Sequence, residues 1–224
     1  MAYNDDNSKE ETRSLPKKGR GLPYLVRTPW WLKRLYPHRV WNMDTSSKTI
    51  YLSFDDGPHP LATPFVLDEL KKYDAKATFF CIGKNVAAFP ALYERILAEG
   101  HAVGNHTRDH LNGWKTGDGE YLENIAAAAE LIQSRLFRPP YGKIRSSQAK
   151  KLAHYRVIMW DVLSGDFDNS VSPEGCYRNV INHTNNGSIV VFHDSEKAWN
   201  KLSYTLPLVL EHFSRAGYRF SAIS

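Results

Sequence analysis

From Lys48 to the C-terminus, short apolar runs alternate with longer stretches that have the apolar spacing of amphipathic helices. The apolar runs end at Gly, Pro, Asp or Asn, as buried strands do. The strands that this pattern predicts are 49–54, 77–82, 101–105, 136–138, 156–161, 187–193 and 217–222. The helices that it predicts are 61–73, 91–99, 119–136, 146–154, 174–184 and 204–215. The alternation favours an α/β domain with a parallel sheet, either open or rolled into a barrel.

The positive charge of the chain is confined to its N-terminal part. Residues 1–41 hold nine Lys and Arg against four Asp and Glu, whereas residues 42–224 hold twenty of each. A nucleic-acid-binding body needs a basic face, so nucleic acid is not an expected partner. No run is apolar and long enough to span a membrane. Residues 1–21 lack the apolar core of a signal peptide, so the sequence as it stands predicts a cytoplasmic protein; the alternative is an export signal that this sequence does not contain.

Three regions are expected along the chain. Residues 1–21 carry few apolar side chains and are predicted to be a disordered tail. Residues 22–47 are predicted to cap the main domain at 48–224, and they contain the aromatic run Pro29–Pro37. Two interpretations of this run remain open. It packs against the domain as a plug, or it anchors residues 1–41 on an anionic surface, since basic residues flank its aromatic ones.

Polar residues able to do chemistry follow five of the predicted strands. These clusters are Asp55-Asp56, Gly104–His110, Arg138–Gly142, Trp160-Asp161 followed by Asp166-Phe167, and Phe192–Ser195. In barrels of alternating strands and helices, active sites collect at the carboxyl ends of the strands. Two adjacent acids are costly to bury unless a cation or a proton lies between them. We therefore expect a functional site at this end of the sheet.

His106 and His110 are four residues apart, so one helical turn or tight loop brings both rings to one side. With Asp56 they make three protein ligands and leave positions open for water, as a catalytic metal needs. Thr107 stands where the zincin motif has Glu, which excludes that motif. Two His and one carboxylate also suit Fe(II), so ligand type leaves the metal open.

If Asp56 binds the metal, Asp55 is free to act as a base. His193 could protonate a leaving group, with Asp166 tuning the imidazole. Arg138 could pair with Asp55. Simpler interpretations remain open: a surface cation at 138, a loop residue at 166 and a buried structural histidine at 193.

Four motifs follow one another along the chain: Ser-Phe-Asp-Asp-Gly-Pro at 53–58, His-Thr-Arg-Asp-His at 106–110, Arg-Pro-Pro-Tyr-Gly at 138–142 and Ile-Val-Val-Phe-His-Asp at 189–194. In these motifs the chain resembles polysaccharide deacetylases, the NodB-homology group of carbohydrate esterase family 4, over residues 48–222. The resemblance implies a single-domain distorted (β/α) barrel of about seven parallel strands. It also implies metal-dependent removal of N-acetyl groups from amino sugars, with Zn²⁺ the expected metal and Co²⁺, Ni²⁺ and Mn²⁺ the alternatives.

The resemblance implies roles for individual residues. Asp55 is the expected base, positioned by Arg138, and His193 is the expected general acid, with Asp166 as its partner. The backbone N–H of Tyr141 matches the oxyanion donor. The expected metal ligands are Asp56, His106 and His110. The remaining expected substrate contacts are Pro139, Phe167 and the apolar acetyl-pocket wall at Val191.

The chain departs from the family pattern at one motif. The family's Asp-x-x-Asp-Trp reads Leu-Ser-Gly-Asp-Phe here. Leu163 thus replaces the first acid and Phe167 replaces a groove-lining tryptophan. Asp161 is a candidate to compensate for the missing acid. The family mostly acts outside the cytoplasm, which conflicts with the location that residues 1–21 predict.

The expected reaction is hydrolysis of the acetamido group of an N-acetylglucosamine-containing polysaccharide, such as peptidoglycan or a chitooligosaccharide. The alternatives are an O-acetyl esterase or a non-sugar amide hydrolase on the same scaffold. A more distant alternative is a non-catalytic glycan-binding module, which would normally have lost Asp55, His193 or a ligand. A monomer is expected, with the acetylated glycan as its partner.

Overall fold

The computed structural model describes residues 24–224, so the predicted tail at 1–21 lies outside the described residues. The strands are β1 (Thr49–Asp55), β2 (Thr78–Cys81), β3 (Ala102–Asn105), β4 (Leu136–Phe137), β5 (Arg156–Val157), β6 (Val162–Leu163), β7 (Ile189–His193) and β8 (Arg219–Phe220). The helices are α1 (Trp30–Leu35), α2 (Ala62–Lys71), α3 (Gly83–Ala88), α4 (Pro90–Ala98), α5 (Asp118–Ala129), the 3₁₀ turn η1 (Pro140–Gly142), α6 (Ser146–Lys151), α7 (Pro173–His183) and α8 (Trp199–Arg215).

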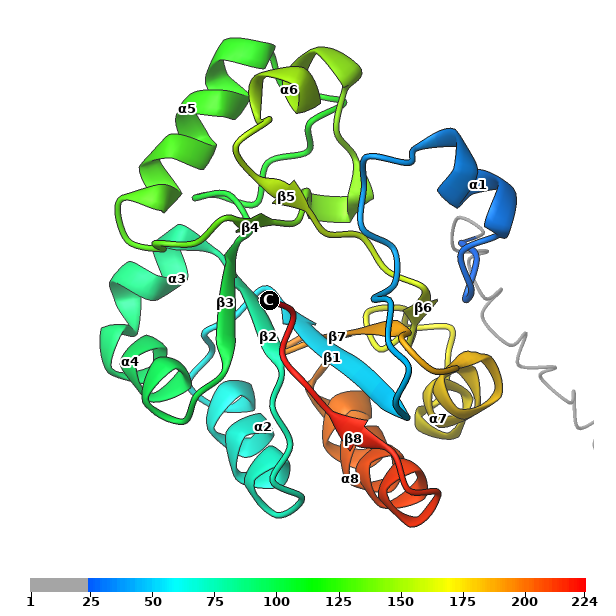
Figure 1. Cartoon of the computed structure of the whole chain (residues 1–224). Coiled ribbons are helices and arrows are strands. Elements are labelled where there is room, and N and C mark those ends of the chain that lie inside the picture. Colours follow the sequence, from blue (N-terminus) through cyan, green and yellow to red (C-terminus); the bar gives the residue numbers. More distant parts are fainter. Residues whose placement is uncertain (1–23) are drawn as a thin grey trace, which may run out of the picture.

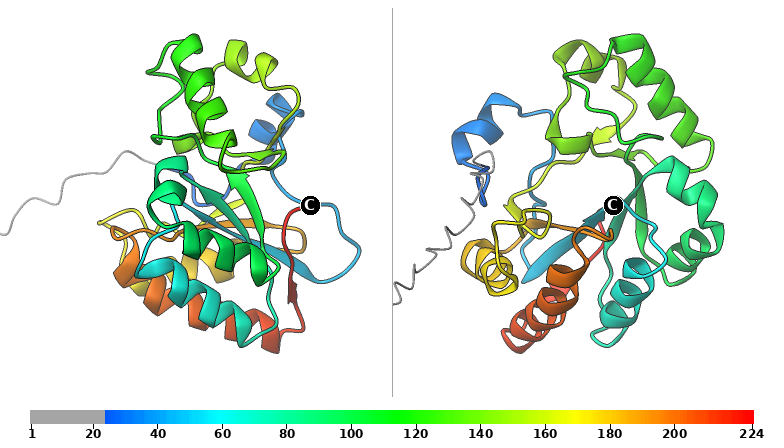
Figure 2. Two further views of the ribbon diagram at one scale, coloured as in Figure 1. Left: turned by 90° about the vertical axis from the view of Figure 1, so that its left-hand side faces the viewer. Right: turned by 180° about the vertical axis from the view of Figure 1, so that it is seen from behind.

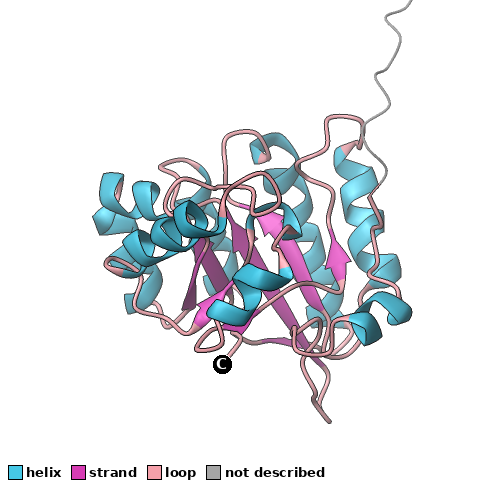
Figure 3. Cartoon of the chain, turned by 90° about the horizontal axis from the view of Figure 1, so that it is seen from above, coloured by secondary structure: helices cyan, strands magenta, loops and turns pink. Residues whose placement is uncertain are grey.

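The strands form one curled parallel sheet in the order β5-β4-β3-β2-β1-β7-β6, and β8 pairs with the start of β1. Helices cover its outer face, and the C-terminus lies near its middle (Figures 1 and 2). Seen from above, the strands lie between the surrounding helices (Figure 3). The distorted α/β barrel that the sequence predicts is confirmed.

Side chains of the central strand β1 alternate between the two faces of the sheet. Leu52 and Phe54 are fully buried in the main apolar cluster. Ser53 and Asp55 point to the other, inner face. Because Asp55 pairs in register with His193 on the parallel strand β7, both side chains lie on this inner face at the carboxyl end of the sheet.

The prediction of a single strand at 156–161 is wrong. β5 pairs with β4 and β6 pairs with β7, at opposite edges of the sheet. Between them the chain crosses from one edge to the other. The Met159 N–H donates to the Val40 carbonyl at 2.7 Å, so this stretch bonds to the N-terminal segment. The apolar side chains at 157–159 are all buried, so the crossing leaves no break in the apolar pattern of the sequence.

The N-terminal segment, residues 24–42, runs along both edges. Val40 forms a parallel bridge beside β5, and Arg27 forms an antiparallel bridge with β6. The segment therefore bonds to a strand at each edge of the sheet (Figure 1). Trp30 and Trp31 nevertheless remain 74% and 53% exposed.

The helix predicted at 119–136 is too long, because α5 ends at Ala129. The Ser134 hydroxyl donates to the Val103 carbonyl at 2.6 Å and accepts the Leu136 N–H at 3.0 Å. These bonds lead the chain into β4 before the helix can continue. The six-residue helix α3 was not predicted.

Candidate active site

Asp55 is held by a buried arginine. Its Oδ1 accepts a hydrogen bond from Arg138 Nη1 at 2.6 Å, and Asp55 is only 4% exposed. Arg138 is fully buried and also donates to Ser53 Oγ at 2.8 Å and to the Met159 carbonyl at 2.9 Å. A planar guanidinium bound at several points has a fixed orientation, so it also fixes the carboxylate. Interpreting Arg138 as a surface cation is therefore wrong.

Asp56, His106 and His110 form the one cluster within residues 24–224 that could hold a metal ion, with ligand atoms all within 4.8 Å of one another. Asp56 Oδ1 lies 3.2 Å from His110 Nε2 and 3.7 Å from His106 Nε2. This oxygen is buried and makes no hydrogen bond to any described residue. Burial alone would raise the pKa of Asp56, but His110 and His193 outweigh it and lower the pKa. The donor set fits a divalent cation.

The tautomer of His106 suits metal binding. Its Nδ1 lies 2.7 Å from the Arg138 carbonyl, which can only accept, so Nδ1 carries the proton. Nε2 then presents its lone pair toward Asp56. Burial lowers the pKa of His106 to about 4, so the ring is neutral at pH 7, as a metal ligand must be.

Backbone strain is concentrated at this site. Asp56, Thr107, His110 and Tyr141 have φ values of 81°, 64°, 58° and 60°. The left-handed region costs a non-glycine residue about 1–3 kcal/mol and persists where the surroundings over-determine it. In the described chain one other non-glycine residue, Asp74, shares this conformation. The loops that carry the ligands are thus held in place by their neighbours.

The Arg138–Gly142 loop offers a free backbone donor. Its Gly142 N–H bonds to the Pro139 carbonyl at 2.9 Å, but the Tyr141 N–H has no acceptor among the described residues. The Tyr141 ring stands 4.6 Å from the His110 ring, so this residue lies beside the Asp56, His106 and His110 cluster. An unpaired N–H here is available to a developing oxyanion.

Asp166 binds His193 twice. Oδ2 accepts the His193 backbone N–H at 2.7 Å, and Oδ1 lies 2.8 Å from Nδ1. Burial lowers the pKa of His193, but the charge and hydrogen bond of Asp166 outweigh it and raise the pKa to about 9. Phe167 stands edge-on to the imidazole at 5.2 Å, and Tyr24 of the N-terminal segment packs on Phe167 at 5.0 Å. Asp166 is therefore more than a loop residue.

The other expected contacts are also close by. Val191 is buried on β7, two residues before His193 and on the same face. Pro139 is buried directly after Arg138. The structure thus brings all of the predicted catalytic, ligand and substrate residues to one end of the sheet. Their roles remain predictions.

Asp161 does not compensate for Leu163. Its carboxylate accepts from Lys33 Nζ and from Ser188 Oγ, both at 2.6 Å. Ser188 precedes β7, whereas His193 ends it, so Asp161 lies at the other end of that strand. It fastens the N-terminal segment instead.

The sequence analysis gave one residue of the site no role. Asp194 is fully buried, and its Oδ1 accepts the Gly57 N–H at 3.0 Å while Oδ2 accepts from Thr63 Oγ1 at 2.5 Å. Burial raises the pKa of Asp194 to about 8. These bonds fix the turn that follows Asp56. The available signal was the position of Asp194 directly after His193 in the last motif.

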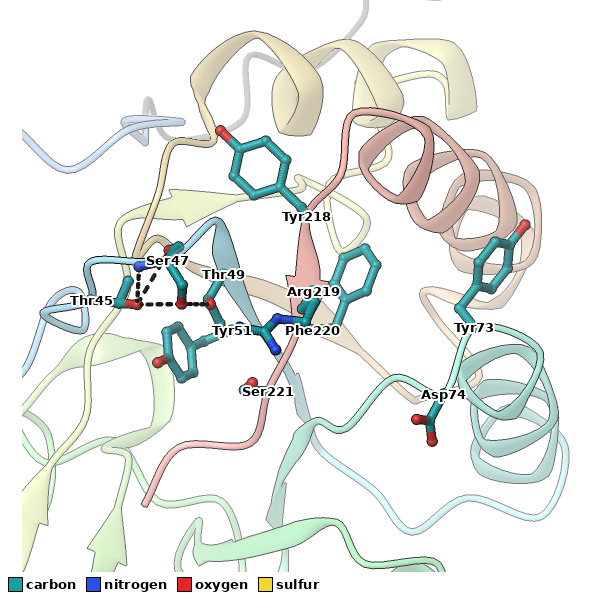
Figure 4. A pocket seen from close by; sticks show the side chains of 10 residues that line it. All are labelled: Thr45, Ser47, Thr49, Tyr51, Tyr73, Asp74, Tyr218, Arg219, Phe220 and Ser221. Atoms are coloured by element: carbon teal, nitrogen blue, oxygen red, sulfur yellow. Dashed lines mark hydrogen bonds between the residues drawn. The ribbon is translucent and has the colours of Figure 1, made fainter.

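A cavity of about 400 Å³ opens at the opposite end of β1 (Figure 4). The hydroxyl groups of Thr45, Ser47 and Thr49 bond to one another along its wall. None of the predicted site residues lines this cavity. The candidate chemistry therefore lies at the Asp55 end of the strand.

Residues 42–158 match the family model of polysaccharide deacetylase. The chain belongs to this family. A peptidoglycan-N-acetylglucosamine deacetylase from Bacillus cereus is 34% identical to it over 193 residues, which cover 83% of this chain and 91% of the relative. A chitooligosaccharide deacetylase from Azorhizobium caulinodans is 33% identical over 159 residues, which cover 66% and 75%. The predicted family and enzyme class are confirmed.

A solved polysaccharide deacetylase structure has the same fold. The crystal structure of the Bc1960 peptidoglycan N-acetylglucosamine deacetylase, bound to 4-naphthalen-1-yl-N-oxidanyl-benzamide, superposes with a TM-score of 0.80. It is 30% identical, and the match covers 88% of this chain and 95% of that one. Some relatives are longer: the chain spans 56% and 38% of the length of two further peptidoglycan deacetylases.

Proposed function

We propose that this polysaccharide deacetylase removes acetyl groups from N-acetylglucosamine units of a glycan, with peptidoglycan as the favoured polymer. One observation carries the proposal. The Asp55–Arg138 and His193–Asp166 pairs flank the metal-ligand cluster on the inner face of the sheet. A base, an acid and a cation site thus converge where one acetamido group would fit.

The metal-ligand cluster fits a divalent ion because the buried Asp56 Oδ1 makes no hydrogen bond and faces the Nε2 atoms of His106 and His110. When bound, such an ion would polarise the acetyl carbonyl and lower the pKa of water. Zn²⁺ is our preferred ion for two imidazoles and one carboxylate, and Co²⁺, Ni²⁺ and Mn²⁺ are the alternatives.

Asp55 is assigned as the base. Its carboxylate takes a proton from the water that forms a C–O bond to the acetyl carbon. Arg138 keeps the carboxylate aimed at the inner face. The negative charge that develops on the carbonyl oxygen is stabilised by the Tyr141 N–H, for which no described residue is an acceptor.

His193 is assigned as the general acid. Its Nδ1 is held by Asp166, which leaves Nε2 to protonate the amine nitrogen as the C–N bond breaks. The products are acetate and a free amino sugar. Val191 supplies the apolar wall for the acetyl methyl group, and Phe167 and Pro139 border the sugar.

Acetate release from metal-reconstituted protein tests this function. The panel is peptidoglycan, chitooligosaccharides and acetyl-xylan, with Asp55→Asn protein as the control. Release from the N-acetylated glycans supports the proposal. Release from acetyl-xylan alone would favour the O-acetyl esterase, and no release from any polymer would favour a glycan-binding module.

The N-terminal segment is assigned a second contact, with an anionic surface of the cell envelope. Trp30, Trp31 and Leu35 are exposed beside Arg34 on α1, a combination that suits peripheral binding. No described helix could cross a membrane. A wall polymer as substrate favours action at the envelope over the cytoplasmic location that residues 1–21 predicted. Sedimentation with anionic but not neutral vesicles, by a monomeric protein, is the expected result.

A further inference from the structure

A cavity of about 700 Å³ adjoins the candidate active site at Tyr141 and Leu163. One wall comes from the N-terminal segment, and the other comes from the loop before α6, together with Trp114 and Trp160. We propose that this cavity binds a carboxylate-bearing sugar next to the sugar being deacetylated, and that Arg39 and Lys143 bind its carboxylate. This inference rests on the proposed glycan deacetylase function.

Aromatic rings form much of the cavity wall, which is lined by Tyr24, Tyr36, Trp41, Trp114, Tyr141 and Trp160. Tyr141 and Trp114 are 60% and 58% exposed. The Trp114 ring is nevertheless held, because its Nε1 donates to the Ile144 carbonyl at 3.3 Å. Exposed rings with fixed orientation provide flat apolar surfaces for sugar rings at little cost in side-chain entropy. The volume is that of an ordinary ligand site.

The charge of the lining is one-sided: it includes Arg39, Lys143 and Arg145 but no carboxylate. Arg145 is partly engaged, because its Nη2 donates to the Trp114 carbonyl at 2.7 Å. Arg39 lies 4.2 Å from the Tyr36 ring and Lys143 lies 5.3 Å from the Trp114 ring. Neither forms a salt bridge with a carboxylate of residues 24–224. The two cations therefore remain available to an anion.

The two cations lie on different walls. Arg39 comes from the N-terminal segment, and Lys143 follows η1, two residues after Tyr141. A carboxylate in the cavity would therefore have a half-buried cation on each wall. An N-acetylmuramic acid unit without a stem peptide offers a ring face and a carboxylate, whereas a chitooligosaccharide offers only the ring faces. Charge complementarity therefore favours an acidic glycan. The family model matches residues 42–158 and so includes Lys143 but not Arg39.

The test compares three tetrasaccharides on metal-loaded protein. The first alternates N-acetylglucosamine with N-acetylmuramic acid, the second is the same compound with its carboxyl groups converted to methylamides, and the third is chitotetraose. We expect Arg39→Gln/Lys143→Gln to raise KM about tenfold on the acidic compound alone, with kcat unchanged. Lys150→Gln is the matched control, since Lys150 is exposed on α6 and does not line the cavity.

Equal rises in KM on all three compounds, or no change on any, would overturn the inference. Calorimetric titration of the acidic tetrasaccharide tests the cavity independently of turnover. If wild-type protein binds it about tenfold more tightly than the double variant does but releases no acetate, the inference stands and the deacetylase proposal fails. Thermal unfolding of the variants verifies that they fold, and Lys143→Gln alone replaces the double variant if that one does not.

Discussion

Gly57 and Asp194 lie so close that a Cβ atom at position 57 would be 2.0 Å from Asp194 Oδ2. The φ of Gly57 is not in the left-handed region, so space rather than backbone conformation requires glycine here. The carboxylate occupies that space because it accepts the Gly57 N–H. A side chain at 57 would displace Asp194 and the turn that carries Asp56.

Gly57→Ala should therefore destabilise the protein by about 1–3 kcal/mol, as overpacking does. Urea unfolding measures the change. Because the clash is with one side chain, Asp194→Gly should cost less in the Gly57→Ala background than in the wild type. Strictly additive effects of the two changes would show that the close approach is not the cause.

Asp166→Asn should shift the pH dependence of turnover. His193 must be protonated to act as an acid, so wild-type activity should persist until the pH rises through about 9. Without the Asp166 charge, burial dominates and lowers the pKa, so the alkaline limb of kcat should move to lower pH by at least about one unit. Glu196→Gln, an equivalent change on an exposed residue nearby, should leave the profile unchanged.

The His193–Asp166 pair should also make the free energy of unfolding depend on pH. The pKa of His193 is raised above its ordinary 6.5, so the folded protein holds this proton more tightly than the unfolded chain does. Its stabilisation is complete below pH 6.5 and is lost as the pH rises through about 9. The difference in unfolding free energy between wild type and Asp166→Asn should thus be larger at pH 6 than at pH 10. An equal difference at both values would contradict the assignment.

Arg138→Met should be strongly destabilising because it leaves the Asp55 carboxylate buried without a cation. Breaking a buried ion pair from one side costs about 3–5 kcal/mol. Arg138→Lys keeps the charge but cannot reach the same acceptors at once, so its cost should be intermediate. Denaturant unfolding measures both, with Arg108→Met as the exposed control. A cost for Arg138→Met no larger than that control's would count against the buried-pair argument.

Two variants should distinguish the residues that bind the metal from the residue that acts as the base. Asp55→Asn removes the proposed base but no ligand, so it should keep the metal and lose about 10²–10⁴-fold in turnover. His106→Ala should lose both. Metal content after dialysis and competition with a chelator measure affinity, and acetate release measures turnover. Full activity of the metal-free protein, or of Asp55→Asn, would refute this division of roles.

Sequence analysis located the site because its residues follow strands, and parallel strands bring their carboxyl ends together. It could not predict contacts between segments that are far apart in the sequence, because such contacts do not affect the periodicity of apolar residues. Tyr24 packs on Phe167, and Asp161 binds Lys33, yet neither contact leaves a trace in the apolar pattern. For the same reason the crossing inside 156–161 looked like one strand. Asp194 was given no role because a buried acid and a turn acid look alike in sequence.

The N-terminal segment limits how far this chain can be shortened from its N-terminal side. A fragment that began at residue 42, where the family match starts, would leave β5 and β6 with unpaired edges. Free strand edges template pairing between chains, so such a fragment is expected to self-associate rather than stay dispersed. The autonomous folding unit therefore extends upstream of residue 42, where the match to the family model begins. A fragment for expression should start no later than Tyr24.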